Sequence, residues 1–296
     1  MSEKEIELHI LSAFVDGDRG GNPAGVVLDA DDLGRQARQR LAARIGLSEI
    51  AFVSASEKAA FKLEFFTPTR QIAHCGHATV ATFAYLAQIG RVSRGRSAKE
   101  TIDGVRVIIL AEDMAFMEQQ APRYQSLDRE EMAALLDSLS LTANDLLPGH
   151  RPVVVNTGNS FLLVPLPDEI TLAKLRPQHD RVARVSQRLG LVGYYPFTLQ
   201  TQVPGRDAAA RMFAPHYGIP EESATGMAAG PLACYFFDKF RRREQRFVIE
   251  QGRLMDPPSP SELIVDLNVT AGRVQSLMAG GRARLVETCR LSVESP

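Results

Sequence analysis

The chain has 296 residues and a formal net charge of -1 at pH 7, and 45% of its residues are hydrophobic and 23% are charged. This composition is typical of an ordinary globular protein of about two domains, and the near-zero charge gives no electrostatic basis for binding nucleic acid or an anionic membrane. Three widely spaced cysteines do not form a disulfide framework, and the sequence has neither a signal-peptide pattern nor an apolar run of about 18 residues, so we expect a cytoplasmic protein without a membrane contact.

The N-terminal half is predicted to contain one amphipathic helix and one buried helix. Apolar residues at helical spacing indicate a helix over 31–44, which Gly46 ends. Residues 76–89 contain no helix breaker and are apolar nearly all round, so this second helix must be buried. Alternating apolar and charged residues over 61–66 are typical of a half-buried strand. Further strands are expected at 6–15, 24–28 and 50–53, and 101–110 is expected to be a strand or a hairpin around Gly104.

The C-terminal half follows the same order of predicted elements. An amphipathic helix is expected over 127–139, further helix within 172–189, and a second buried helix over 228–240. Strands are expected at 153–155, 161–164, 197–202 and 209–213, and again from 247 onward. The order of elements in each half predicts an α+β fold with mostly antiparallel sheets, rather than a doubly wound fold. That order is strands, an amphipathic helix, more strands and a buried helix.

The boundary between the halves is expected within 119–127, where Gln, Pro, Arg and Ser interrupt the apolar pattern. We place the N-terminal half at 1–120 and the C-terminal half at 121–282. A last strand at about 283–296 is expected to return to the N-terminal half.

The most informative pattern is a short signature that occurs twice, at a constant offset of 150 residues. The first copy has Cys-Gly-His at 75–77 and the second has Thr-Gly-Met at 225–227, and each opens a predicted buried helix. A Gly-Asn pair lies upstream of each copy, at 21–22 and at 158–159. A chain built as two similar halves predicts a site between them, made from equivalent pieces of each.

Each buried helix begins at a glycine, Gly76 or Gly226. A helix N-terminus has unpaired backbone N–H groups and a partial positive charge, and glycine permits a ligand to approach the backbone closely. We therefore expect the two helix starts to bind a small carboxylate-bearing metabolite. The alternative is that each glycine only permits the helix to pack on a sheet, and the duplication favours the binding role.

His74, Cys75 and His77 form a tight cluster in the sequence. No carboxylate or second Cys/His pair stands nearby, so we expect no metal. The helix start would lower the pKa of the Cys75 thiol, but a small buried hydrophobe is the commoner role for such a residue. His77 is either a proton shuttle near neutral pH or a hydrogen-bonded histidine at a helix start. No phosphate-binding loop, dinucleotide-type glycine pattern or Gly-x-Ser-x-Gly elbow occurs, so no cofactor is expected.

Two acidic residues, Glu49 and Glu222, lie before the first and the second copy of the signature. Glu49 follows Ser48 and precedes an apolar run, which by itself indicates little. Glu222 forms a like-charged pair with Glu221 just before the second signature. That pair is either a solvated turn favoured by the helix dipole or part of a catalytic site.

In this order, the motifs resemble the PhzF-like (phenazine biosynthesis) isomerases, which have the diaminopimelate epimerase-like fold. The resemblance covers nearly the whole chain and rests on Gly21-Asn22-Pro23, Leu47-Ser48-Glu49, Phe66-Thr67-Pro68, Cys75-Gly76-His77-Ala78-Thr79, Arg211-Met212-Phe213-Ala214-Pro215, Glu221-Glu222-Ser223-Ala224-Thr225-Gly226 and Gln251-Gly252. It implies two pseudo-symmetric halves, each a curved, mostly antiparallel sheet wrapped around a central buried helix. It also implies a site in the cleft between them, proton transfer without a cofactor, and a homodimer.

The resemblance assigns roles to individual residues. Glu49 matches the family's acid/base glutamate, His77 matches its active-site histidine, and Glu222 stands where the family usually has aspartate. The substrate-binding positions are Ser48, Cys75, Gly76, Gly226 and Met227. Glu222 is longer than aspartate by one methylene, and Met227 replaces a serine whose hydroxyl could bind substrate. With a third departure at 255–259, these changes leave the expected fold intact but weaken the case for the phenazine precursor as the substrate.

The preferred function is a cofactor-independent isomerase that moves a proton within a small carboxylate-bearing metabolite. Glu49 is its general acid/base, which requires burial to raise the carboxyl pKa toward the working pH. One alternative is an epimerase or racemase of an amino or hydroxy acid, which needs a thiol at each helix start, whereas Thr225 occupies the second. Another is a non-catalytic protein that binds a small carboxylate, against which Glu49 and His77 argue.

Overall fold

The computed structural model describes residues 3–294, which form a mixed, mostly antiparallel β-sheet with a few helices. The chain divides into two units: unit 1 extends to Glu118 and resumes at Gly280, and unit 2 is Gln119–Ala279. Two strands carry the chain from one unit to the other, β8 (Met114–Gln120) and β18 (Arg273–Glu294). The last two residues of the strand expected at about 283–296 lie outside the described residues.

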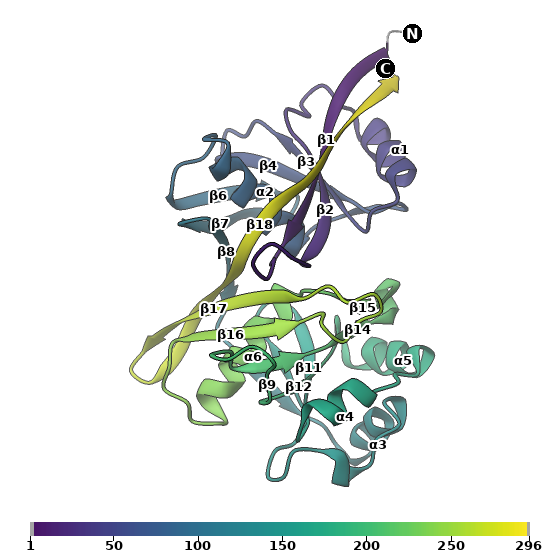
Figure 1. Ribbon diagram of the computed structural model, residues 1–296, viewed down its shortest axis with the longest axis vertical. Helices are drawn as coiled ribbons and strands as arrows, with labels where there is room; N and C mark the ends of the chain where they lie inside the picture. The colour runs from purple at the N-terminus through teal and green to yellow at the C-terminus, as the bar shows by residue number, and fades with distance from the viewer. Residues whose placement is uncertain (1–2, 295–296) are drawn as a thin grey trace. The chain divides into compact units, whose positions relative to one another are not determined.

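In unit 1, antiparallel and parallel strand pairs alternate, and a helix connects the two strands of each parallel pair. In chain order it contains β1 (Glu3–Ala13), β2 (Asn22–Val27), α1 (Arg35–Ile45), β3 (Ile50–Ser54), β4 (Phe61–Phe66), β5 (Gln71–Ile72), α2 (Gly76–Gln88), β6 (Gly95–Thr101) and β7 (Gly104–Ala111). Strand β1 pairs antiparallel with β2, and β2 runs parallel to β3 across α1. Strand β3 is antiparallel to β4, and β4 is parallel to β6 across α2. Strand β18 lies beside β1 in antiparallel register (Figure 1).

Unit 2 has the same pairing order. It contains β9 (Arg123–Ser126), α3 (Arg129–Ser138), β10 (Val153–Asn156), β11 (Ser160–Pro165), α4 (Glu169–Lys174), α5 (His179–Leu189), β12 (Gly193–Thr198), β13 (Ala208–Ala210), β14 (Met212–Ala214), β15 (Ile219–Glu222), α6 (Gly226–Asp238), β16 (Arg246–Gln251) and β17 (Ser261–Thr270). Strands β10 and β11 are antiparallel, β11 and β12 parallel, β12 and β13 antiparallel, and β13 and β16 parallel. The signature repeated in the sequence is therefore also repeated in the topology.

The helices α2 and α6 are the buried helices of the two units, as their all-round apolar sequences predict. Helix α2 packs against β1, β2, β3 and β7, and α6 packs against β10, β11, β16 and β17. Both helices have 13 residues. Neither has a side chain that caps its N-terminus, so the backbone groups of each first turn lack that partner.

Three sequence-based expectations are wrong. The helix expected from residue 31 begins at Arg35, because Asp31 accepts a hydrogen bond from Ala55 N instead of capping the helix. The strand expected to reach residue 202 ends at Thr198. The order of one amphipathic helix per half is wrong for the C-terminal half, because the further helix expected within 172–189 is present in addition to α3 and Pro177 divides it into α4 and α5.

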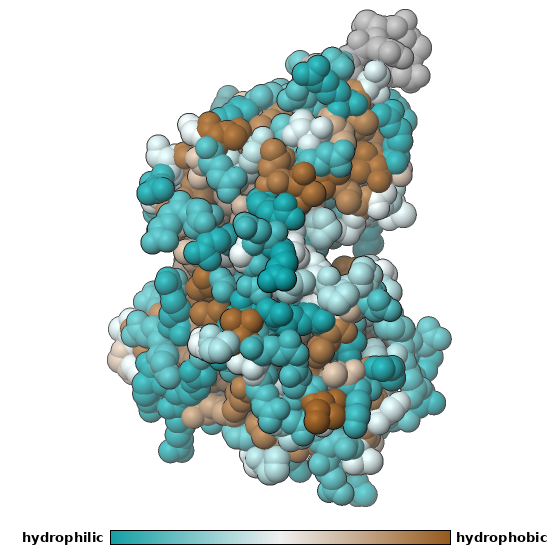
Figure 2. Space-filling view, in the orientation of Figure 1, coloured by the Kyte–Doolittle hydropathy of each residue, from teal (hydrophilic) through white to brown (hydrophobic). Residues whose placement is uncertain are grey.

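No helix within residues 3–294 is long and apolar enough to cross a membrane. On the face shown in Figure 2, hydrophilic residues predominate and hydrophobic ones are scattered among them. The large exposed hydrophobic side chains likewise come from many elements, among them Ile102, Ile170 and Val286. Scattered apolar residues of this kind are normal on a folded protein.

Candidate active site

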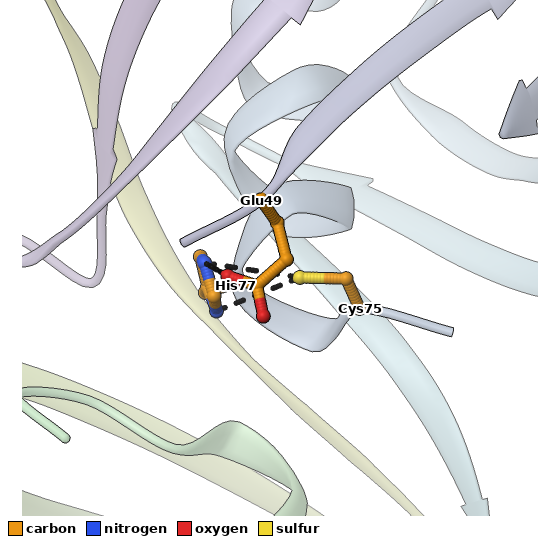
Figure 3. Close-up of side chains that lie close together, drawn as sticks. All are labelled: Glu49, Cys75 and His77. Carbon is orange, nitrogen blue, oxygen red and sulfur yellow. Dashed lines mark hydrogen bonds and ion pairs between the residues drawn. The ribbon is translucent and has the colours of Figure 1, made fainter. Parts of the chain in front are cut away.

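Three reactive side chains of unit 1 point toward one another at the start of α2 (Figure 3). Glu49 directly precedes β3, Cys75 is the residue before α2, and His77 lies in the first turn of α2. His77 Nε2 lies 3.2 Å from Glu49 Oε2, and Cys75 Sγ lies 3.6 Å and 3.7 Å from the two ring nitrogens of His77. The Glu49 side chain is 11% exposed and that of His77 is 6% exposed, so their interaction is only weakly screened by water.

The parallel pairing of β2 with β3 positions Glu49. Its carbonyl oxygen accepts a hydrogen bond from Gly25 N at 3.0 Å. A Cβ at Gly25 would lie 3.0 Å from the Ile50 side chain, so glycine at this position lets the two strands approach closely. The strand register therefore holds the carboxylate beside the start of α2, although Glu49 and His77 lie in different sequence motifs.

The three groups influence one another's pKa. Burial alone would raise the pKa of Glu49, but His77, helped by Ser48, outweighs burial and lowers it below the usual value. Burial also disfavours a charged His77, yet Cys75 and Glu49 raise the pKa of His77 well above its usual value. Burial raises the pKa of the Cys75 thiol. Glu49 and His77 thus favour each other's charged forms, whereas burial favours the neutral form of the Cys75 thiol.

One expectation about titration is therefore wrong, and for Cys75 the structure favours the alternative of a buried side chain. Glu49 does not have a raised pKa, because the adjacent imidazolium favours the carboxylate more than burial disfavours it. The helix start does not lower the pKa of Cys75 either, since burial has the larger effect. Glu49 is already in the basic form that proton abstraction requires.

Lys99 on β6 is a second feature of this region, and sequence reasoning missed it because it lies in a strand of mostly polar residues. It is 1% exposed, and its Nζ donates a hydrogen bond to Thr79 Oγ1 at 2.6 Å. Thr79 Oγ1 in turn donates to the carbonyl oxygen of Cys75 at 2.6 Å. Burial lowers the pKa of Lys99 to about 7. Lys99 therefore holds the start of α2 through Thr79.

The His-Cys-His cluster of the sequence does not form one site. His74 Nε2 pairs with Asp103 Oδ2 at 2.9 Å and is partly exposed. The third residue beside Cys75 and His77 is Glu49 and not His74. Glu49, Cys75 and His77 present ligand atoms that all lie within 4.8 Å of one another, which is a spacing suited to a metal ion.

In unit 2, Gln251 holds the residues that precede α6. Its Oε1 accepts hydrogen bonds from Tyr195 Oη at 2.9 Å and from Thr225 N at 3.2 Å. Its Nε2 donates to the carbonyl oxygen of Glu222 at 2.7 Å and to Thr225 Oγ1 at 3.3 Å. Thr225 Oγ1 donates a short hydrogen bond to the Glu222 carboxylate. One amide side chain thus fixes both Glu222 and the N-terminus of α6.

A second amide, Gln119, holds the first turn of α6. Its Nε2 donates to the carbonyl oxygen of Gly226 at 2.9 Å, and its Oε1 accepts from Thr157 Oγ1 at 2.7 Å. A Cβ at Gly230 would lie 2.4 Å from Gln119 Oε1, so only glycine leaves room for this contact. Thr157 precedes the second Gly-Asn pair, which links that motif to the helix start.

The acidic pair before α6 separates into two roles. Glu221 forms a bidentate ion pair with Arg211, at 2.8 Å and 2.7 Å, and so serves the structure of unit 2. Glu222 remains beside Thr225 and is partly exposed. Met227 in the first turn of α6 is also partly exposed, and Gly226 is buried.

Comparisons with known proteins agree on one family. The family model described as phenazine biosynthesis-like protein, PhzC-PhzF, matches residues 11–288. A protein named as an uncharacterized isomerase of Deinococcus radiodurans is 34% identical over 283 residues, which cover 92% of this chain and 90% of the relative. The trans-2,3-dihydro-3-hydroxyanthranilate isomerase of Pseudomonas chlororaphis is 30% identical over 234 residues, which cover 76% of this chain and 78% of that enzyme.

Solved structures share the fold. The crystal structure of a PhzF-family phenazine biosynthesis protein of Bacillus anthracis has a TM-score of 0.87 at 26% identity and covers 97% of this chain and 99% of that one. A hydroxyproline epimerase of Agrobacterium vitis has a TM-score of 0.60 at 12% identity and covers 100% of this chain and 93% of that one. At that identity the second likeness concerns the fold alone.

Proposed function

The chain belongs to the phenazine biosynthesis-like PhzC-PhzF family and is an isomerase, and we propose that it moves a proton within a small carboxylate-bearing metabolite. The observation that carries this proposal is the pairing of Glu49 with His77, whose reactive atoms lie 3.2 Å apart in a nearly buried setting. Moving a proton from one carbon to another needs a base for the first step and an acid for the second. In this proposal Glu49 serves as the base and then as the acid, and His77 stabilises the charge.

The proposed step begins with the Glu49 carboxylate, which accepts a proton from a carbon adjacent to an unsaturated or carboxylate-bearing group. The electron pair of the broken C–H bond enters the conjugated system, and Glu49 returns the proton to another carbon. The step is redox neutral and has no leaving group. His77, whose charged form Cys75 and Glu49 favour, would stabilise the anionic Glu49 before the transfer and the negative charge on the substrate during it.

Substrate binding is proposed for the helix starts. Neither α2 nor α6 has a side-chain cap, so their first-turn N–H groups suit a substrate carboxylate. Ser48, Cys75, Gly76, Gly226 and Met227 are proposed to line the substrate. Glu222 is proposed as a second acid/base group, oriented by Thr225. We also propose that the sheet of each unit curves around its buried helix. That the protein is a cytoplasmic homodimer remains a prediction.

The two-thiol alternative has less support. An epimerase of that kind needs a thiol at both helix starts, and the equivalent positions hold Cys75 before α2 and Thr225 before α6. The Thr225 hydroxyl is engaged with Glu222 and Gln251, so it is a structural group of unit 2. We therefore favour isomerisation centred on Glu49.

Solvent-deuterium exchange tests the proposal. A panel of small unsaturated and amino carboxylic acids, including the compound named for the Pseudomonas chlororaphis enzyme, is incubated with the protein in D2O and analysed by NMR and mass spectrometry. We expect deuterium at the transferred position with the wild-type protein and a loss of exchange in Glu49→Gln. Glu57→Gln, which changes an exposed glutamate of the same unit, is the matched control. Exchange at the wild-type rate in Glu49→Gln would contradict the role of Glu49.

A further inference from the structure

Glu49, Cys75 and His77 combine the three donor types that zinc prefers, namely carboxylate oxygen, thiolate sulfur and imidazole nitrogen. They come from two separate segments, the residue before β3 and the start of α2. Figure 3 shows the three side chains converging on one another. Among residues 3–294, this is the group of His, Cys, Asp and Glu whose ligand atoms gather closely enough to hold an ion.

Two of the three donor separations match a tetrahedral coordination shell, and all the donor atoms lie within 4.8 Å of one another. Zinc bonds of about 2.3 Å to sulfur and about 2.0–2.1 Å to nitrogen or oxygen place S and N about 3.5 Å apart and N and O about 3.3 Å apart. The Cys75 Sγ to His77 nitrogen distances are 3.6 Å and 3.7 Å, and the His77 Nε2 to Glu49 Oε2 distance is 3.2 Å. Cys75 Sγ is almost equidistant from the two ring nitrogens, and the imidazole torsion about Cβ–Cγ is broad, so a rotation of the ring would direct one nitrogen at the ion.

The electrostatics of the bound form are also favourable. A divalent ion with one thiolate and one carboxylate ligand has no net charge, which avoids burying an uncompensated charge in this nearly closed site. Glu49 Oε2 is buried and, within the described residues, receives no well-aligned hydrogen bond, so a metal–oxygen bond would satisfy it. As the ion enters, the thiol and imidazolium protons pass to solvent.

We propose that Glu49, Cys75 and His77 form a three-donor site for zinc or a similar borderline-soft divalent ion, and that a bound ion stops proton transfer. The ion uses the Glu49 lone pair that would accept the substrate proton. Water completes the fourth position. The inhibitory part rests on the proposed isomerase function, whereas the binding part does not.

Cobalt binding tests the site without any substrate. Chelator-treated full-length protein is titrated with Co2+, and we expect one equivalent to give a thiolate-to-cobalt charge-transfer band that Zn2+ displaces. Cys75→Ser should abolish the band. Cys289→Ser, which removes the other thiol of unit 1, is the matched control and should leave it unchanged. A band that survives Cys75→Ser, or that is absent from the wild-type protein with excess Co2+, overturns the proposal.

X-ray absorption of the zinc-loaded wild-type protein avoids dependence on variants. We expect one sulfur at about 2.3 Å and nitrogen or oxygen atoms at about 2.0–2.1 Å. A shell without sulfur, or with more than one, overturns the site. In the deuterium-exchange assay, one equivalent of Zn2+ should abolish exchange and a chelator should restore it. If the spectroscopic site is present but exchange continues at full zinc occupancy, the inhibitory part is overturned and the binding part stands.

Discussion

The starts of α2 and α6 are equivalent positions of the repeated topology, yet they are built from different chemistry. In unit 1, ionisable groups meet there, and Glu49 and His77 form a charged pair beside a thiol. In unit 2, amides and hydroxyls surround a single carboxylate, with Gln251 and Thr225 beside Glu222. The comparison indicates that the two units share the topology of the helix start but differ in the side chains that meet there.

The residues that hold the two helix starts also differ in charge. Lys99 reaches the start of α2 from β6, through Thr79, and Gln251 reaches the start of α6 from β16. The strands β6 and β16 are equivalent in the pairing order of the two units. The contact of Lys99 with the start of α2 depends on pH because a buried amine titrates, whereas the contact of Gln251 with the start of α6 does not, because an amide is neutral.

The largest effect is expected from Glu49→Gln. Loss of the base should lower the rate of deuterium exchange by about 10²–10⁴-fold, the usual contribution of a positioned acid/base group. Glu222→Gln should lower it by about tenfold, because its amide oxygen still accepts the Thr225 hydrogen bond. Equal losses in the two variants would contradict the assignment of the chemistry mainly to unit 1.

Lys99→Met should change how stability depends on pH. The folded pKa of Lys99 is about 7, below its usual 10.5, so between these values the unfolded state binds more protons. The free energy of unfolding of the wild-type protein should therefore rise with pH across this window, by up to about 1.4 kcal/mol per pH unit, and level off below pH 7. Urea denaturation at several pH values should show that this rise is lost in Lys99→Met. If the free energy of unfolding depends on pH equally in the wild-type protein and in Lys99→Met, the pKa of Lys99 is not lowered by burial.

Gln251→Leu should destabilise the protein by about 2–4 kcal/mol, without a comparable pH dependence. It leaves buried groups of Tyr195 and Thr225, and the Glu222 carbonyl, without their partner. Gln88→Leu removes a single hydrogen bond, to the Ala283 carbonyl, and is the control, with an expected loss of about 1 kcal/mol. Similar losses in both variants would show that the Gln251 network contributes no more than one ordinary bond.

The smallest effect is expected from Met227→Ser. A hydroxyl at the start of α6 adds one hydrogen bond to a substrate and should lower KM by about 2–10-fold, with little change in kcat. Steady-state kinetics on the substrate found by the exchange assay measure both constants. If kcat changes and KM does not, residue 227 affects the chemical step and not substrate binding.

The candidate site could be predicted in part. Glu49, His77 and Glu222 were found through a family resemblance, and the structure brings Glu49 to His77 while Glu222 lies beside Thr225 in unit 2. Lys99 and Gln119 were missed, because neither stands in a chemical motif and their roles arise from contacts with distant residues. The lowered pKa of Glu49 was also missed, since burial can be inferred from sequence but its charged neighbour cannot.

The sequence by itself determined the two buried helices, the duplicated signature and the α+β character, because apolar periodicity and glycine placement are local properties of the chain. Tertiary structure alone decided which groups meet. Strand register placed Glu49 rather than His74 beside Cys75 and His77, and it joined Lys99 to Thr79 and Gln251 to Thr225. The physical reason is that charge and hydrogen bonding depend on distance in space, which a one-dimensional pattern does not contain.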